Sequence, residues 1–189
     1  TAMALKTLKI FFNNIPIIGV IEPGSKQAII KTNKKKIGVI GTIATISSNA
    51  YEKSIKEKDA EVNIISKACP LFVPFVEEGL IEGSAINEIA KHYLLFFNNK
   101  VDTLILGCTH YPLLKEVIVK NTQNIELIDS ASSVANDAYK KLEKYKLLSD
   151  QSNPGKLNCY VTDLPMRFKE LGNIFLGENI EDLHLINDF

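Results

Sequence analysis

One short stretch of this chain combines residue types that can transfer a proton. Residues 106–112 read Leu-Gly-Cys-Thr-His-Tyr-Pro, so the thiol of Cys108 lies two residues before the imidazole of His110. A helix N-terminus or a neighbouring imidazole lowers the pKa of a thiol and favours the reactive thiolate. Thr109 adds a hydroxyl and a backbone N–H for an anionic ligand. We predict that Cys108 is a reactive thiol whose pKa is lowered toward neutrality; the alternative is a small buried cysteine in a loop.

Four further residues are candidates for the same site. Glu77 and Glu78 lie in a predicted loop, where one carboxylate could hold His110 as the imidazolium. The alternative is a pair of solvated acids. Thr42 and Thr45 lie three residues apart at a predicted helix start. They either cap that helix or bind a carboxylate group of a ligand.

The remaining cysteines do not indicate a metal or a disulfide framework. Cys69 precedes a proline and Cys159 lies within a predicted strand, so we expect packed thiols at both positions. Three widely spaced cysteines fit reduced thiols in a cytoplasm. Structural zinc sites use four ligands, usually as two close pairs, whereas Cys108 and His110 are the only close pair here. The chain also has no glycine-rich dinucleotide fingerprint and no phosphate loop, so we expect neither a metal nor a cofactor.

The amino-acid composition indicates a globular protein and argues against nucleic-acid binding. The chain has 189 residues, of which 46% are hydrophobic and 23% charged, as in globular proteins. The 22 basic and 22 acidic residues balance, which argues against a nucleic-acid partner. The basic run at residues 34–36 is interpreted as a solvated turn. No stretch reaches the roughly 20 apolar residues of a membrane span, and no signal peptide is recognisable.

Apolar segments of strand length alternate with helical patterns along the chain. Helices are expected at residues 1–14, 25–32, 43–56, 84–97, 112–120 and 131–144, with Ser84 as the cap of the fourth, and strands at 15–21, 37–40, 62–66, 101–106, 125–128 and 156–162. Residues 22–24 are a turn signal, and the last 25 residues are weakly patterned. This alternation predicts an α/β fold with a parallel sheet. Ligands bind at the carboxyl ends of such strands, where the pattern places Glu22, Thr42 and Cys108.

Four segments together resemble the glutamate racemases of the aspartate/glutamate racemase superfamily. Besides residues 106–112, these are residues 18–24, 37–42 and 68–74, in the order and at about the spacing of that family. The resemblance implies interconversion of L- and D-glutamate without a cofactor, which supplies D-glutamate for peptidoglycan. Two cysteines would flank the α-carbon. Cys108 would be one of them, His110 would assist it with Glu77 as its carboxylate partner, and Thr109, Thr42 and Thr45 would bind the substrate.

The resemblance also implies a domain arrangement. The family has two Rossmann-like parallel-sheet domains related by pseudo-symmetry, and its motif around the first catalytic cysteine does not occur in this sequence. We therefore expect residues 15–130 to form the second α/β domain, which carries Cys108. Residues 1–14 and 131–189 would be remnants of an incomplete first domain. A C-terminal fragment of this kind is expected to be inactive alone.

Other readings remain open at this stage. One is an aspartate racemase or related isomerase, although those enzymes usually have Glu at the position of His110. Another is a non-catalytic binding module of the same fold. The expected partner is a small molecule, glutamate, with no membrane contact, and a homodimer is the assembly considered.

Overall fold

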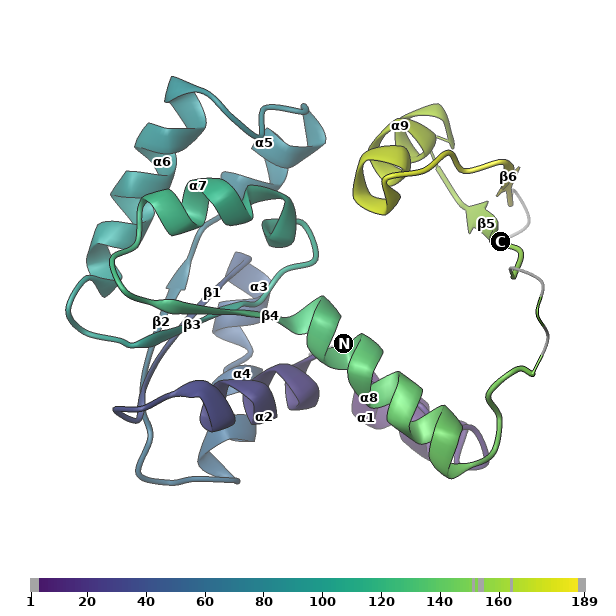
Figure 1. Ribbon diagram of the computed structural model, residues 1–189, viewed down its shortest axis with the longest axis horizontal. Helices are drawn as coiled ribbons and strands as arrows, with labels where there is room; N and C mark the ends of the chain where they lie inside the picture. The colour runs from purple at the N-terminus through teal and green to yellow at the C-terminus, as the bar shows by residue number, and fades with distance from the viewer. Residues whose placement is uncertain (1–3, 151, 153–154, 164, 187–189) are drawn as a thin grey trace. The chain divides into compact units, whose positions relative to one another are not determined.

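The computed structural model describes residues 4–150, 152, 155–163 and 165–186 (Figure 1). The chain divides into two compact units, Thr1–Leu147 and Leu148–Phe189. Each unit is described by itself below.

A four-stranded parallel sheet forms the centre of the first unit. Its strand order is β2-β1-β3-β4, and the strands are β1 (Lys36–Gly41), β2 (Asn63–Ala68), β3 (Thr103–Leu106) and β4 (Glu126–Asp129). In register, Ile40 of β1 lies beside Leu106, which in turn lies beside Asp129. The carboxyl ends of β1, β3 and β4 therefore share one edge of the sheet, and the predicted parallel α/β architecture is confirmed.

Helices cover both faces of this sheet (Figure 1). Alternate side chains of β1 and β3 enter two separate buried clusters, because successive strand residues point to opposite faces. One cluster packs under α5 (Phe72–Glu77), α6 (Ser84–Leu94), η1 (Leu95–Phe97), η2 (Tyr111–Leu114) and α7 (Lys115–Lys120). The other packs under α2 (Ile21–Lys31) and α4 (Ala50–Lys56). The remaining helices of this unit are α1 (Leu5–Phe11), α3 (Ile43–Ser47) and α8 (Ser130–Lys144).

The apolar stripe predicted for residues 84–97 is buried as expected. Ile86, Ala90 and Leu94 are fully buried against the sheet. The expected cap is wrong, however, because Gly83 occupies the N-cap position and Ser84 is already the first helical residue. Gly83 has φ +97°, a backbone conformation that favours glycine.

The strand predicted at residues 15–21 is wrong. Residues 15–20 form no strand, and Ile21 begins α2. The sequence Glu22-Pro23-Gly24 forms the first turn of that helix, where proline is tolerated because the first N–H groups have no helical acceptor. Glu22 consequently does not lie at a strand end. Its carboxylate lies 3.4 Å from the ammonium of Lys58.

In its described residues, the second unit contains a parallel pair of strands and a helix. The strand predicted at residues 156–162 is present as β5 (Asn158–Val161), which pairs with β6 (Asp182–Leu185). Helix α9 (Pro165–Leu176) and β6 were not predicted from the weakly patterned C-terminal segment. In the part of the chain that the structure describes, no helix is both long and apolar enough to cross a membrane.

Candidate functional site

Cys108 lies directly beyond the carboxyl end of β3. The preceding Gly107 donates its N–H to the carbonyl of Ile40 at 2.8 Å, which continues the pairing with β1 for one residue. A Cβ atom on Gly107 would lie 2.7 Å from that carbonyl oxygen, so the close approach of the two backbones requires glycine. The pairing of Gly107 with β1 therefore fixes the backbone position of the half-buried Cys108 that follows it.

Cys108 lines a pocket of about 390 Å³ at the carboxyl ends of the strands. The walls combine apolar side chains with a few hydroxyls, as is common for small-molecule sites. The lining residues are Val20, Ile21, Thr45, Tyr51, Gly107, Cys108, Thr109, Ser130, Ala131 and Val134. The segment that was wrongly predicted as a strand thus contributes two apolar wall residues, Val20 and Ile21.

The electrostatic environment of Cys108 differs from the sequence-based expectation. Burial raises the pKa of the Cys108 thiol, and the N–H groups of His110, Tyr111 and Thr109 offset that rise only in part. The predicted lowering toward neutrality is therefore wrong. The following helix is a short 3-10 turn that starts at Tyr111, so desolvation outweighs the stabilisation of the anion. The loop nevertheless presents several N–H donors to a thiolate once it forms.

His110 connects the thiol to a carboxylate. Its Nδ1 lies 3.9 Å from the sulfur of Cys108 and 3.4 Å from the hydroxyl of Thr109. Its Nε2 lies 3.3 Å from Oε1 of Glu77. Glu77 is the last residue of α5 rather than a loop residue, and Glu78 follows as the C-cap. A carboxylate on the Nε2 side favours the tautomer with Nε2–H, which leaves Nδ1 able to accept the thiol proton.

The two threonines occupy different positions in the site. The hydroxyl of Thr42 accepts a hydrogen bond from the N–H of Thr45 at 3.2 Å and caps α3. The two hydroxyl oxygens lie 3.0 Å apart. Thr45 lines the pocket, whereas Thr42 does not line it and contacts it through Thr45. Capping, one of the two alternatives for Thr42, is present.

Neither of the other cysteines lines the pocket. Cys69 is fully buried, burial raises its pKa to about 12, and its carbonyl accepts a hydrogen bond from the Tyr111 hydroxyl at 2.9 Å. The prediction of a packed thiol is confirmed there. Cys159 is half-buried in β5 of the second unit. No group of three or more His, Cys, Asp or Glu side chains suited to a metal ion occurs among the described residues.

Comparison with known proteins identifies the family. Residues 1–138 match the sequence model of the Asp/Glu/Hydantoin racemase family. The chain belongs to that family. It is 48% identical over 181 residues to a glutamate racemase of Aquifex aeolicus, with 96% of this chain and 67% of that protein covered. It is 43% identical over 188 residues to one of Chlorobium phaeobacteroides, with 98% and 69% covered.

Solved racemase structures share the fold. The glutamate racemase of Francisella tularensis, in complex with D-glutamate, superposes with a TM-score of 0.90 at 37% identity, covering 98% of this chain and 69% of that one. A glutamate racemase isoform from Bacillus anthracis gives a TM-score of 0.89 at 37% identity, covering 98% and 71%. The family resemblance expected from the four sequence motifs is confirmed.

Two polar residues of this racemase-family pocket were missed from the sequence. The hydroxyls of Tyr51 and Ser130 lie 2.9 Å apart, and both residues are buried. Ser130 follows β4 directly, so extending the strand-end rule to that strand would have pointed to it. Tyr51 lies in a helix rich in small residues, and its sequence context gives no comparable signal.

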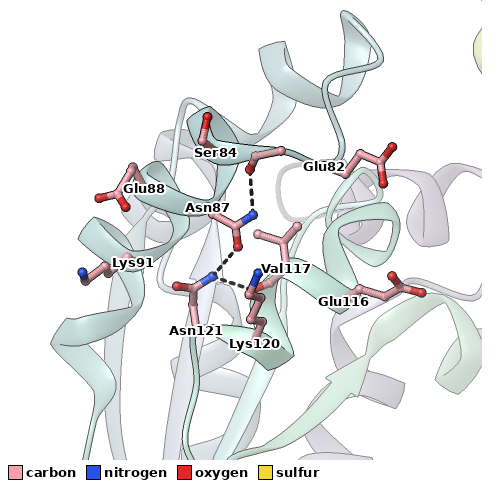
Figure 2. Close-up of a pocket in the computed structure, with 10 residues that line it drawn as sticks. Glu82, Ser84, Asn87, Glu88, Lys91, Glu116, Val117, Lys120 and Asn121 are labelled. Atoms are coloured by element: carbon pink, nitrogen blue, oxygen red, sulfur yellow. Dashed lines mark hydrogen bonds between the residues drawn. The ribbon is translucent and has the colours of Figure 1, made fainter.

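A second hollow lies between α6 and α7, with a volume of about 600 Å³ (Figure 2). Amide side chains hold its floor together: Asn87 donates to the Gly83 carbonyl at 2.7 Å, and Asn121 donates to Asn87 at 3.3 Å. Its rim consists of long charged side chains, including Glu88 and Lys120 (Figure 2). None of the acid/base candidates of the racemase site lines it.

Proposed function

We propose that this chain provides the Cys108 side of the active site of a glutamate racemase, which interconverts L- and D-glutamate. The observation that carries the proposal is the geometry around Cys108, where a thiol, the imidazole of His110 and the carboxylate of Glu77 follow one another at contact distances. This arrangement occurs in a chain that is 43–48% identical to two glutamate racemases over nearly its whole length.

In the proposed reaction, Cys108 exchanges a proton with the α-carbon of glutamate. The thiol first gives its proton to Nδ1 of His110, and Glu77 stabilises the resulting imidazolium. The thiolate then removes the α-proton, while a second acid/base group delivers a proton to the opposite face. Because the α-proton is weakly acidic, the pocket must stabilise developing negative charge with fixed donors and little water.

The hydroxyls of the pocket are proposed to bind the polar groups of glutamate. Thr109 and Thr45 line the pocket beside Cys108 and can reach a carboxylate or an amino group. Thr42 is proposed to act through Thr45, because their hydroxyls lie 3.0 Å apart. This arrangement fixes the substrate relative to the sulfur. Holding the reacting groups in position lowers the entropic part of the activation barrier.

A two-thiol mechanism needs a second cysteine in the pocket. Of the three cysteines, Cys108 alone is among the residues that line the pocket within the first unit, and Cys69 is buried under α5. We therefore expect that the 189-residue chain alone binds glutamate but does not racemise it.

A chimera tests the proposal. In it, these 189 residues replace the matching part of the Aquifex aeolicus racemase, and chiral chromatography follows conversion of L-glutamate to D-glutamate. We expect activity after dialysis against a chelator and without pyridoxal phosphate. Cys108→Ser should lower kcat by at least about a thousandfold, since an essential acid/base group is lost. Glu77→Gln should lower kcat less, and the matched control Cys159→Ser should leave it unchanged.

The outcomes separate the candidate functions. A folded chimera that racemises aspartate but not glutamate would indicate an aspartate racemase. One that binds glutamate without exchanging the α-proton in D₂O would indicate a binding module. Full glutamate turnover by the Cys108→Ser chimera would refute the assignment of Cys108.

The finer aspects of function are proposals of the same kind. We propose that the D-glutamate serves peptidoglycan synthesis in the cytoplasm, where thiols stay reduced. Residues 15–130 are proposed as the Cys108 domain, with residues 1–14 and 131–189 assigned to the first domain. A homodimer is the proposed assembly, and sedimentation of the purified chain tests it.

A further inference from the structure

Two hydroxyls that line the Cys108 pocket, those of Tyr51 and Ser130, are linked by hydrogen bonds to the end of β3. Ser130 donates its hydroxyl proton to the carbonyl of Leu106 at 3.3 Å. A serine hydroxyl has one proton, so when that proton is donated to Leu106 the 2.9 Å contact between Tyr51 and Ser130 has Tyr51 as the donor. The chain of hydrogen bonds thus runs from Tyr51 through Ser130 to Leu106, two residues before Cys108.

The pair is tightly enclosed. Tyr51 is 4% and Ser130 7% exposed, and they come from α4 and the first turn of α8. A Cβ atom on Gly107 would lie 3.0 Å from the Tyr51 ring, and one on Gly24 would lie 2.8 Å from the Ser130 hydroxyl oxygen. The ring and the hydroxyls therefore lie against the turn that leads into Cys108, with two glycines giving them room.

Stability alone does not account for this pair. A buried hydroxyl is costly unless it is paired, and a paired one contributes only about 1 kcal/mol. A phenylalanine at position 51 would fill nearly the same volume. Ser130 could still donate to Leu106 but would no longer be held in that orientation by Tyr51, so the fold itself has little need of the phenol oxygen.

We propose that Tyr51 and Ser130 are positioning residues that hold the Leu106–Gly107 turn. In that position the Cys108 sulfur remains within hydrogen-bonding reach of the backbone N–H groups of its own loop. The proposal rests on the racemase function only for the use made of Cys108. Burial raises the pKa of Tyr51 and outweighs the lowering by the Ser130 hydrogen bond, so the hydroxyl stays protonated near neutral pH. Tyr51 and Ser130 need not touch the substrate for this role.

The three cysteines of the chain provide the test, because each reports on a different place. Cys108 reports on the pocket, fully buried Cys69 on opening of the core, and Cys159 on the second unit. Iodoacetamide alkylation of the 189-residue chain is followed for each cysteine by peptide mass spectrometry between pH 6 and 10. This readout does not depend on turnover.

In Tyr51→Phe, we expect the midpoint pH of Cys108 alkylation to rise by about half a unit, which is about threefold slower alkylation below the midpoint. The loosened turn would move the sulfur off the N–H groups that stabilise the thiolate. Ser130→Ala should show the same shift and a larger loss of stability, because it leaves the buried Tyr51 hydroxyl without its hydrogen-bond partner. The double variant should show no further shift and should recover part of that stability.

The matched control is Tyr139→Phe, which removes the same atom from an exposed tyrosine of α8. It should leave all three profiles unchanged. An unchanged Cys108 profile in folded Tyr51→Phe, or additive shifts in the double variant, would overturn the proposal. So would a rise in Cys69 alkylation that parallels the change at Cys108, since that pattern reports general loosening. Absence of racemase activity in the chimera would instead contradict the proposed function and leave this result standing.

Discussion

The Cys108 thiol is subject to two opposed effects. Burial favours the neutral thiol, while the backbone N–H groups of its loop and the hydroxyl of Thr109 favour the thiolate. A base that must accept a proton from a carbon gains strength when its pKa is high. The raised pKa therefore suits a thiol that is deprotonated only when His110 takes its proton.

The sequence was informative about the types of residue at this site but not about their environment. The spacing of Cys108, Thr109 and His110 is local, so the motif shows it directly. The pKa of Cys108 depends on burial by side chains from segments far away along the chain, and its direction was wrongly predicted. Tyr51 and Ser130 were missed for the same reason, because they are 79 positions apart.

Cys69 supplies a prediction about alkaline pH. Its folded pKa of about 12 lies above that of an unfolded cysteine, so the folded state keeps a proton that the unfolded state releases. The stabilising contribution is complete below the ordinary thiol pKa and is lost as the pH rises above it. Between pH 9 and 10 we expect the free energy of unfolding to fall by about 1 kcal/mol from this residue.

Urea unfolding at pH 8, 9 and 10 measures that fall. In Cys69→Ala the decline from pH 9 to 10 should be smaller by that amount, whatever the fixed cost of the substitution. Working at or below pH 10 keeps the buried Tyr111 hydroxyl, whose pKa burial also raises, from dominating. Equal slopes in both proteins would show that the folded Cys69 thiol ionises normally.

At the scale of elements, the strands of the central sheet were predicted more reliably than the segment before α2 and the C-terminal helix α9. Strands β1 and β3 are apolar runs flanked by turns, and both were predicted. The run at residues 15–21 has the same composition but leads into α2, because a short apolar run fits a strand or a buried segment equally well. Helix α9 was not predicted, and its hydrophobic residues, such as Met166 and Ile174, remain substantially exposed.

The junction between β3 and the Cys108 loop gives a prediction about packing. Gly107→Ala would bring a Cβ atom to 2.7 Å from the Ile40 carbonyl oxygen, a backbone atom that cannot rotate away. We expect the free energy of unfolding to fall by about 2 kcal/mol, as is typical of overpacking. Thermal or urea unfolding measures the loss.

Gly155→Ala is the matched control, since none of the described atoms lies within 4 Å of its added Cβ. That variant should change stability by less than about 0.5 kcal/mol. If both alanine variants proved equally stable, the strand end would be more adaptable than its hydrogen bond to Ile40 indicates.

On the scale of the whole molecule, buried side chains are distributed unevenly between the two units. Both clusters that pack against the four-stranded sheet lie between Ile21 and Ile128, within the segment proposed as the Cys108 domain. In the described part of the second unit, the buried hydrophobic residues are Val161 and Ile180. A segment of roughly 40 residues with so small a core rarely folds without added support.

We therefore expect residues 1–147 to fold without the second unit and to keep the Cys108 pocket, because every residue that lines the pocket lies in the first unit. The truncated chain should unfold cooperatively on heating, and its Cys108 should show the alkylation profile of the 189-residue chain. Residues 148–189 alone should show no cooperative transition. Cys69 is the internal control, since its burial against α5 depends only on the first unit. If Cys69 were alkylated in the truncated chain as fast as in urea, the sheet and its two clusters would be insufficient for folding, and the second unit would have to contribute to the core that holds Cys108 in place.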